Sequence, residues 1–408
     1  MKKILLISSS FPYYPGEQFL ETEVNYYNNV SLTVLPLNSH EKYRTLPKHI
    51  KIDNYIINKK SNIFYKVYYI LKSMLNPIFY KEFFIEVGIN IKRVKPFLSS
   101  VYAYQRYCDL FNNYFKNEQE VENTVVYTYW HNEATYALQS LKQKYNYKLV
   151  SRIHGYDIYK ERRLDSYMPL KHLFTSKIDK IFTITQSANK YLSQTYGFKD
   201  EILELSRLGV DDKSINSKTT QYGSFCIVSC SFLVDVKRID KIIDALAKLS
   251  KEVPNIKFKW NHIGNGTLES VLKNYAMQKL SKLNNVEYHF LGNIENKDVY
   301  KFYKNNAVNV FVNVSESEGV PVSIMEAMSC HIPIIAPNIG GISDMIIDNK
   351  SGKLLSEKCE VDELVSALSD IEFFKNKIVR EKTYEVYLER YNSKKNYSDF
   401  VHDLSNLN

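Results

Sequence analysis

Short apolar segments with the composition of buried β-strands alternate with amphipathic helical patterns along most of this chain. In the first half the strand-like segments are SLTVLPL, TVVYTYW, KLVSRIHG and KIFTITQS, and helical stretches such as EATYALQSLKQKY separate them. Such alternation predicts parallel sheets, because parallel strands need a long crossover that is usually a helix. The pattern therefore indicates an α/β fold and excludes an all-α or all-β architecture.

The alternation is interrupted once. Residues 211–223, DDKSINSKTTQYG, contain one aliphatic side chain in thirteen, and the strand–helix pattern restarts at SFCIVSC. A chain of 408 residues has room for two domains of this kind. We predict an N-terminal domain over residues 1–211, a linker over 212–223 and a C-terminal domain over 224–384. The C-terminal helix, about 385–408, can pack back on the first domain. Open α/β sheets bind ligands at the carboxyl ends of their strands, which places the expected site in a cleft between the domains.

The N-terminus MKKILLISSS has an apolar run of only four residues and no small-residue cleavage site. It predicts a first buried strand and not a signal peptide. No segment approaches the ~20 apolar residues of a membrane span. The five cysteines are irregularly spaced and are expected to be buried thiols in a reducing compartment. These features indicate a cytoplasmic protein, which could also bind peripherally to the inner face of the membrane.

The net charge of +9 is concentrated in residues 42–95, which hold twelve Lys or Arg and three acids. Aromatic clusters, NIFYKVYYIL and NPIFYKEFFIEV, lie in the same segment. Basic residues interleaved with aromatic ones suit an anionic membrane surface or a phosphate-rich ligand. A helical layer with a solvated basic face is the alternative, and both interpretations stay open. No nucleic-acid recognition motif accompanies the charge, so no nucleic-acid partner is expected.

The stretch SESEGVPVSIMEAMS, residues 315–329, places two carboxylates, Glu318 and Glu326, around the start of a predicted helix. Pro321 suits the first turn, where its missing N–H costs nothing. Backbone N–H groups at a helix N-terminus bind phosphate, and carboxylates accept hydrogen bonds from sugar hydroxyls. The order of acid, phosphate cradle and acid therefore indicates a nucleotide-sugar site.

This stretch resembles the Glu-x7-Glu signature of retaining glycosyltransferases of family 4, the glycosyl transferases group 1. The segments IVSCSFLVDVKRIDKIIDAL, HIGNGTLESVL, VEYHFLGNIENKDVYKFY and PIIAPNIGGISDMIIDNKSGKLL resemble further motifs of that family in the same order. In the first half RIHGYDIY and SRLGVDD resemble its weaker motifs. The resemblance implies the GT-B fold, in which two doubly wound Rossmann-like domains face each other across a cleft.

Carried over by position, the resemblance implies a role for each matching residue. Glu318 would hold the donor sugar and help to stabilise the reacting ring, and His154 would lie beside that sugar. Glu326 would bind the ribose and Lys237 the diphosphate. The other implied donor-binding positions are Gly16, in the N-terminal loop that faces the phosphates and acceptor, Ile294, at the base, and Gly319, Val320, Pro321, Val322 and Ser323, at the hexose and diphosphate.

Two positions depart from the family pattern. The family usually has an Arg five residues before the Lys; here Phe232 stands there, and we expect it to pack, with Arg238 as a possible replacement cation. Gly16 is followed by Glu17, where many relatives have a second glycine. These departures concern donor affinity and acceptor geometry. His131 ends a predicted strand and could line the acceptor side.

The function that the resemblance implies is a retaining, metal-independent hexosyltransferase without a cofactor. It would move a hexose from a nucleoside-diphosphate sugar, expected to be UDP-linked, to a glycan or lipid-linked oligosaccharide in bacterial surface-polysaccharide synthesis. A catalytically silent GT-B subunit that binds a sugar nucleotide or a partner transferase is the alternative. The intact Glu318, Glu326, Lys237 and His154 favour the enzyme. A GT-B epimerase is disfavoured by the same layout. No pattern indicates an oligomeric state.

Overall fold

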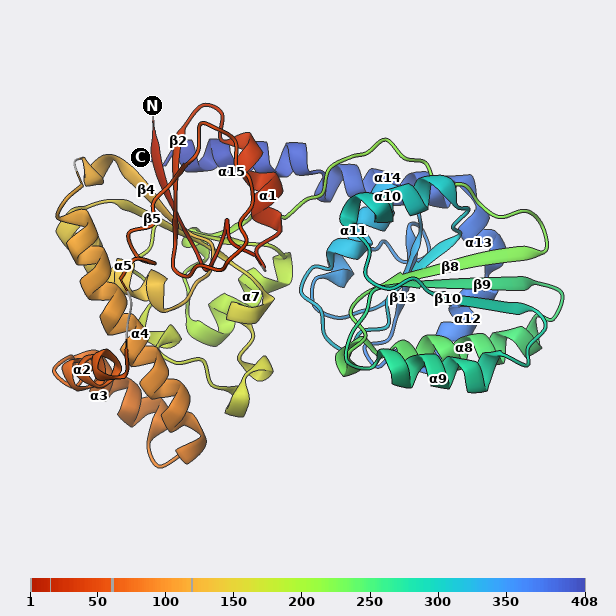
Figure 1. Cartoon of the computed structure of the whole chain (residues 1–408), viewed down its shortest axis with the longest axis horizontal. Helices are drawn as coiled ribbons and strands as arrows, with labels where there is room; N and C mark the ends of the chain where they lie inside the picture. Colours follow the sequence, from red (N-terminus) through yellow and green to blue (C-terminus); the bar gives the residue numbers. More distant parts are fainter. Residues whose placement is uncertain (1, 15, 60–61, 119, 408) are drawn as a thin grey trace. The chain divides into compact units, whose positions relative to one another are not determined.

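The computed structural model describes residues 2–14, 16–59, 62–118 and 120–407. Two compact units make up the chain (Figure 1). The N-terminal unit is Met1–Leu208 together with Lys395–Asn408, and the C-terminal unit is Gly209–Lys394. Each unit is built around its own parallel sheet, so the predicted α/β fold with two doubly wound halves is confirmed.

The N-terminal unit contains a seven-stranded sheet in the order β3-β2-β1-β4-β5-β6-β7. All neighbouring strands are parallel. The strands are β1 Lys3–Ser8, β2 Ser31–Pro36, β3 Lys51–Ile52, β4 Thr124–Thr128, β5 Lys148–Ile153, β6 Lys180–Thr183 and β7 Leu203–Leu205. The order of the strands reverses between β1 and β4, which creates a topological switch point at their carboxyl ends. The strand predicted at the N-terminus is confirmed as β1.

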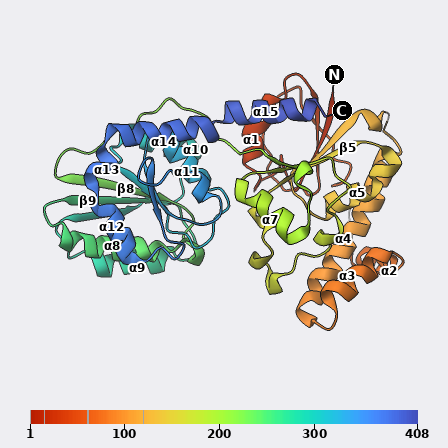
Figure 2. The same cartoon turned by 180° about the vertical axis from the view of Figure 1, so that it is seen from behind.

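Helices cover both faces of this sheet. The helices of the unit are α1 Phe19–Glu23, α2 Ile63–Ser73, α3 Pro77–Glu82, α4 Ile91–Phe115, α5 Glu133–Tyr145, α6 Gly155–Ile158, α7 Gln186–Tyr196 and the C-terminal α15 Ser393–Ser405. Of these, α2 and α3 pack against α4 and not against the sheet. One core contains residues of α4, α5 and α7, and the other contains residues of α1 and α15. Phe400 of α15 packs edge-on against Tyr127 and Phe182 of the sheet. The chain ends meet where Lys2 Nζ donates to the Leu407 carbonyl at 2.7 Å (Figure 2).

The C-terminal unit contains a six-stranded sheet in the order β10-β9-β8-β11-β12-β13, again with all strands parallel. Its strands are β8 Ser224–Cys230, β9 Lys257–Ile263, β10 Val286–Phe290, β11 Val310–Val312, β12 Ile334–Pro337 and β13 Gly352–Leu355. The helices are α8 Ile239–Glu252, α9 Glu269–Leu280, α10 Asn296–Asn305, α11 Val322–Ser329, α12 Val361–Ser369, α13 Ile371–Lys375 and α14 Lys377–Arg390. Helices α8, α9 and α12 lie on one face of the sheet, and α10, α11 and α14 lie on the other (Figure 1). The strand order reverses between β8 and β11.

The predicted linker, residues 212–223, does not stand apart from the C-terminal unit. Ser217 N–H donates to the Cys330 carbonyl, and Val308 N–H donates to the Lys218 carbonyl at 2.8 Å. Thr220 Oγ1 donates to Asn309 Oδ1 at 2.9 Å. The segment has a single aliphatic side chain, Ile215, yet its backbone and hydroxyl groups bind the unit through hydrogen bonds, which an apolar pattern cannot predict.

The described chain contains no helix that is both long and apolar enough to cross a membrane. The five cysteines are free thiols. The C-terminal helix predicted at about 385–408 is found as the end of α14 and as α15.

Candidate functional site

The switch point of the C-terminal sheet brings together the loops that follow β8 and β11. The first leads through the 3-10 turn Asp235–Lys237 into α8, and the second leads through residues 313–321 into α11. The Glu316 N–H donates to the Val236 carbonyl at 2.9 Å and joins the two loops. A crevice at this point of a doubly wound sheet is where such folds bind nucleotides.

Glu318 and Lys237 meet at this junction. Lys237 Nζ lies 2.6 Å from Glu318 Oε1, and the Glu318 side chain is only 9% exposed. The same oxygen accepts hydrogen bonds from Ser315 Oγ at 2.7 Å and Asn313 Nδ2 at 3.1 Å. Two side chains from the strand end thus orient the carboxylate beside a cation. The Glu318–Lys237 pairing brings together two residues predicted for one site, whereas Asn313 and Ser315 were not singled out in the sequence.

The backbone at the start of α11 supports the same site. Pro321 is the residue before the first turn, and Val322 and Ser323 begin the helix, where the first N–H groups have no acceptor within the helix. Gly340 lies against this backbone with φ +53°, and a Cβ on it would approach the Glu318 carbonyl oxygen to 2.1 Å. Gly341 N–H donates to the Gly319 carbonyl at 2.7 Å. The pair Gly340–Gly341 therefore holds the loop that carries Glu318, a role that sequence reasoning did not assign.

Glu326 lies within α11 and is buried, with 5% of its surface exposed. Burial raises the pKa of its carboxyl group to about 7, and a hydrogen bond from Asn296 Nδ2 partly opposes the rise. Asn296 begins α10, two residues after Ile294, which lies half-buried in the loop between β10 and α10. Asn296 therefore links Glu326 to the loop that carries Ile294, the other residue predicted to contact the nucleoside.

Phe232, the departure near Lys237, and Arg238, its suggested replacement cation, both differ from expectation. Phe232 does not pack: its side chain is 65% exposed, because the loop after β8 turns it outward. Arg238 has φ +46° and forms ion pairs with Glu316 and Asp240, which raise its pKa. Its charge is therefore already balanced by two carboxylates, unlike that of an unpaired replacement cation.

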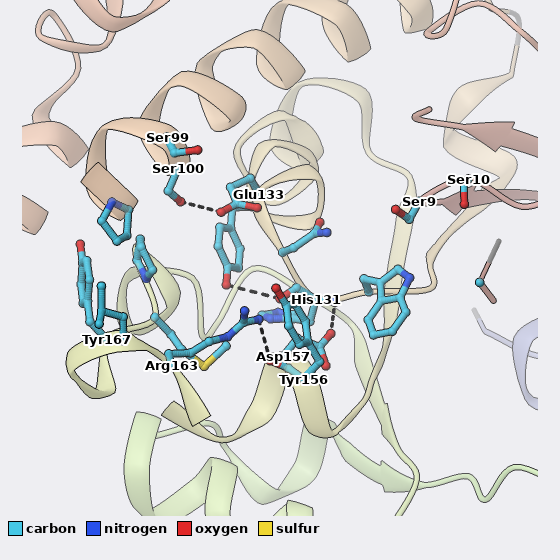
Figure 3. A pocket seen from close by; sticks show the side chains of 18 of the residues that line it. Ser9, Ser10, Ser99, Ser100, His131, Glu133, Tyr156, Asp157, Arg163 and Tyr167 are labelled. Atoms are coloured by element: carbon cyan, nitrogen blue, oxygen red, sulfur yellow. Dashed lines mark hydrogen bonds between the residues drawn. The ribbon is translucent and has the colours of Figure 1, made fainter. Parts of the chain in front are cut away.

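In the N-terminal unit a cavity of about 620 Å³ opens at the carboxyl ends of β1, β4 and β5 (Figure 3). Ser9 and Ser10 lie on one side of it, Arg163 and Tyr167 lie on the other, and Tyr156 lies between them beside Asp157. Its remaining lining comes from the loop after β1, the start of α4, the β4–α5 connection and residues 156–169, namely Gly16, Glu17, Pro96, Ser99, Ser100, Trp130, His131, Asn132, Glu133, Tyr136, Asp157, Leu164, Met168 and Pro169. Gly16 and His131 are thus both placed at this cavity.

Glu17 closes the loop after β1 on itself. Its carboxylate accepts hydrogen bonds from the backbone N–H groups of Ser9, Ser10 and Phe11 at 2.6–2.8 Å, and from Trp130 Nε1 at 2.8 Å. Glu17 has φ +51°, a conformation that favours glycine. Consecutive backbone N–H groups form an anion-binding concavity, and here an internal carboxylate fills it. The departure from two glycines therefore supplies the loop with its own anion.

His154 follows β5 and is buried, with its ring packed 4.6 Å from the rings of Tyr129 and Trp130. Burial, assisted by the positive charge of Arg152, lowers the pKa of His154 to about 3, and a hydrogen bond to the Tyr129 carbonyl opposes this only in part. His154 is therefore neutral at physiological pH. His154 does not line the cavity, but its ring packs against Trp130, which does line it.

A buried polar cluster under the cavity was missed in the sequence. Asp157 accepts hydrogen bonds from the N–H groups of His131 and His154, and Lys171 Nζ lies 3.3 Å from His131 Nδ1. Burial raises the pKa of Asp157 and lowers the pKa values of His131 and Lys171. No local pattern could have indicated Lys171, because it reaches His131 across 40 positions of the chain.

Among the described residues, no group of three or more His, Cys, Asp or Glu side chains is arranged to hold a metal ion. Lys237 is the cation that faces Glu318 at the C-terminal site.

Comparison with known proteins identifies related sequences. Residues 211–385 match the family model described as "Glycosyl transferases group 1". The O-antigen biosynthesis glycosyltransferase WbnH of Escherichia coli is 26% identical over 242 residues, which are 58% of this chain and 64% of WbnH. The matched part is thus slightly under two thirds of that relative's length.

Two solved structures resemble the whole chain. The lipopolysaccharide outer core galactosyltransferase WaaB, in its apo form, has a TM-score of 0.69 at 15% identity and covers 98% of this chain and 99% of its own. Anabaena Alr3699/HepE in complex with UDP has a TM-score of 0.67 at 16% identity and covers 99% and 100%. The family model and the shared architecture agree with the motifs in the sequence. Residues 211–385 therefore match the glycosyl transferases group 1, and the chain as a whole has the GT-B fold.

Proposed function

We propose that this protein is a retaining glycosyltransferase that moves a hexose from a UDP-linked donor to a glycan or lipid-linked glycan acceptor, without a metal ion. The observation that carries the proposal is the Glu318–Lys237 pair, 2.6 Å apart, at the switch point of the C-terminal sheet and beside the N-terminus of α11. A carboxylate, a cation and a helix N-terminus are the groups needed for sugar hydroxyls and a diphosphate.

Each group has a distinct task in this proposal. The N–H groups at the start of α11 and the ammonium group of Lys237 would bind the diphosphate and stabilise its charge as it leaves. Glu318 would then accept hydrogen bonds from donor hydroxyls in place of the one from Lys237. The bond from the anomeric carbon to the diphosphate oxygen breaks, and the bond to the acceptor oxygen forms on the same face. The acceptor proton passes to the leaving diphosphate, so the protein mainly supplies orientation and charge.

The nucleoside end of the donor would meet Glu326 and the backbone near Ile294. A carboxyl group with a pKa of about 7 is partly ionised at physiological pH, and its ionised form accepts hydrogen bonds from ribose hydroxyls better. Asn296, which already donates to Glu326, would keep the carboxyl group in place.

The UDP-linked hexose is supported by two of the structural relatives. HepE has been solved with UDP-glucose, and WaaB is described as a galactosyltransferase. The acceptor is supported by the cavity of the N-terminal unit. Its volume, about 620 Å³, is in the range of small-ligand sites, and its lining combines aromatic rings with carboxylates and hydroxyls, as sugar sites require. His131 Nε2, buried without a hydrogen-bond partner in the described residues, is a further polar atom at this cavity.

The experiment that tests the proposal has two stages. Thermal stabilisation by a panel of UDP-, GDP- and TDP-linked sugars identifies the donor, because a ligand that binds the folded state raises its stability. Release of the nucleoside diphosphate is then followed with and without glycan acceptors, in EDTA, with Glu318→Gln as the control. Donor binding without acceptor-dependent release would instead favour the silent subunit, for which the exposed Phe232 and the already paired Arg238 are arguments. Retention is read from the anomeric configuration of the product by NMR.

A further inference from the structure

The helices α2, α3 and the start of α4, with the π-helical turn Phe83–Val87 between them, carry an unusual concentration of exposed apolar side chains. Thirteen of the 27 large apolar side chains that are exposed among the described residues lie between residues 63 and 91. Exposed apolar patches of this extent mark surfaces that bind a partner or a membrane. We call residues 63–95 the apolar helical surface; Figure 2 shows its helices at the edge of the N-terminal unit, away from the sheet.

The N-terminal half of α2 is exposed around its whole circumference. Every residue from 62 to 68 is exposed, and Ile63, Phe64, Tyr65, Val67 and Tyr68 are 51–79% accessible. A helix on the surface of a soluble protein normally has a polar outer face. An apolar helix end that is exposed on all sides can insert into a fluid phase such as a lipid bilayer. A flat protein surface would cover only one of its sides.

The following segments continue the surface. Leu75, Phe84, Ile89 and Ile91 are 75–101% exposed. Exposure of this degree means that these side chains contribute nothing to the core of the unit. Their replacement by a polar residue is therefore expected to leave the fold intact, which makes the surface testable.

The charges around the apolar side chains have one sign. Lys66, Lys81, Lys92 and Lys95 are exposed, and none of the four forms an ion pair with another described residue. The two acids of the segment are withdrawn: Glu82 is fully buried, where it accepts hydrogen bonds from Tyr167 and Leu170, and Glu86 is paired with Arg93. The surface thus presents apolar and aromatic side chains surrounded by cations, which is the complement of an anionic lipid bilayer.

The apolar helical surface is also continuous with the cavity of the N-terminal unit. Helix α4 begins at Ile91 on this surface, and its residues Pro96, Ser99 and Ser100 line the cavity. Arg93 of α4 binds Asp165 at 2.7 Å, and the neighbouring Leu164, which lines the cavity, is 66% exposed. A lipid-linked acceptor held in the bilayer would therefore have its glycan end beside the cavity.

We propose that residues 63–95 form a docking surface for an anionic lipid bilayer. The apolar side chains of α2, α3 and the start of α4 enter the interface, and the four lysines contact lipid head groups. The proposal that this surface binds a bilayer does not depend on which reaction the protein catalyses. The lipid-linked nature of the acceptor does rest on the proposed function, and the binding experiment separates the two because it needs no donor and no turnover.

The experiment is sedimentation of the full chain with phosphatidylcholine vesicles that contain or lack about one third phosphatidylglycerol, since an anionic surface attracts each lysine by about fivefold in affinity. We expect binding to the anionic vesicles that weakens when salt rises from about 50 mM to about 500 mM, which shortens the Debye length from roughly 14 Å to roughly 4 Å. Equal binding to neutral and anionic vesicles, or none at low salt, would overturn the proposal.

Two variants with matched controls locate the surface. Phe64→Ser, Leu75→Ser and Ile89→Ser combined should reduce binding at least tenfold, whereas Tyr222→Ser, Val271→Ser and Ile378→Ser combined, from exposed positions of the C-terminal unit, should not. Replacing Lys66, Lys81, Lys92 and Lys95 by Gln should abolish the salt dependence. The same change at Lys251, Lys282, Lys304 and Lys350 removes an equal charge elsewhere and should preserve it.

If the apolar variant binds vesicles like the wild type, the docking surface is not at residues 63–95. If the wild type instead self-associates at micromolar concentration and the apolar variant is monomeric, the surface binds protein and the bilayer proposal fails. Circular dichroism of each variant confirms that the fold is retained, and exposure of the replaced side chains makes this the expected result.

Discussion

The two sheets of this protein share one topology but use their switch points in opposite ways. In the C-terminal unit the loop after β11 places Glu318 beside Lys237, and the N-terminus of α11 remains available to a ligand. In the N-terminal unit the loop after β1 also offers a set of backbone N–H groups, but Glu17 of the same loop binds them. A helix start that is open suits a mobile anionic substrate. A loop whose backbone N–H groups already bind a carboxylate of the same chain has a fixed conformation and offers those groups to no ligand.

The difference shows that a doubly wound sheet determines where a site can form and not what it binds. At both switch points a glutamate is the central group. Glu318 accepts hydrogen bonds from the side chains of Lys237, Ser315 and Asn313, which a sugar or phosphate can displace. Glu17 takes three of its four from the backbone, which a ligand cannot move without rebuilding the loop.

The largest expected effect is the loss of turnover in Glu318→Gln. In the proposed function this carboxylate contacts the reacting sugar, so removing its charge should lower kcat at least a hundredfold, about 3 kcal/mol. The Kd for UDP should stay unchanged or become lower, because Lys237 loses its internal partner. Kinetics and calorimetry measure both. The matched control is Glu316→Gln, at a carboxylate of the same loop that pairs with Arg238 and not with Lys237; equal losses in the two variants would contradict the special role of Glu318.

The next effect concerns Glu17→Ala, which should destabilise the N-terminal unit without weakening nucleotide binding. Three buried backbone N–H groups and an indole N–H lose a charged acceptor, so we expect the free energy of unfolding to fall by about 3 kcal/mol. Hydrogen exchange at Ser9, Ser10 and Phe11 should accelerate. Glu17→Gln keeps one acceptor oxygen and should lose about half as much. Unchanged exchange at these amides would mean that the carboxylate does not hold the loop.

The raised pKa of Glu326 predicts that the stability of the C-terminal unit depends on pH. Burial raises the pKa of its carboxyl group from 4.5 to about 7. The folded state therefore binds the proton more tightly than the unfolded state. This stabilisation is complete below about pH 4.5 and is lost as the pH rises through 7, by roughly 2 kcal/mol between pH 5 and pH 8. Unfolding at both pH values should show a loss of stability that is smaller by roughly 2 kcal/mol in Glu326→Gln than in the wild type, because Asp157, whose pKa burial also raises, still contributes in both. The same slope in both would assign it to another group.

The smallest effect tests the exposed Phe232. Because its side chain is 65% exposed, Phe232→Arg should leave stability unchanged. It should tighten the Kd for UDP about fivefold, by about 1 kcal/mol, if a second cation near Lys237 assists the diphosphate. Phe232→Gln is the control for polarity without charge. A gain in both variants would show that the aromatic ring obstructs the site, and no gain in either would show that Lys237 and α11 already suffice.

The sequence predicted the architecture, and it singled out Glu318 and Lys237, which the structure brings together at the switch point of the C-terminal sheet. Strand–helix alternation determines the parallel sheets, and Glu318, residues 319–323 and Glu326 lie within nine positions on one loop and helix. Lys237 was assigned through the family resemblance, and the structure explains its place: it follows β8, the neighbour of β11 in the sheet. The exposure of Phe232 was not predicted, because the packing of a loop side chain depends on residues that are distant in the sequence.

The contacts that only the tertiary structure decided join distant positions. Trp130 reaches Glu17 across 113 positions, Lys171 reaches His131 across 40, and Asn296 reaches Glu326 across 30. The pKa shifts of His131, Lys171 and Glu326 are caused by burial, which depends on how the layers of the fold stack. The sequence determined which residues can accept a proton, a hydroxyl or a phosphate. Packing of the helices on the sheets decided which of them meet, because side-chain chemistry is local whereas proximity and desolvation are properties of the folded chain.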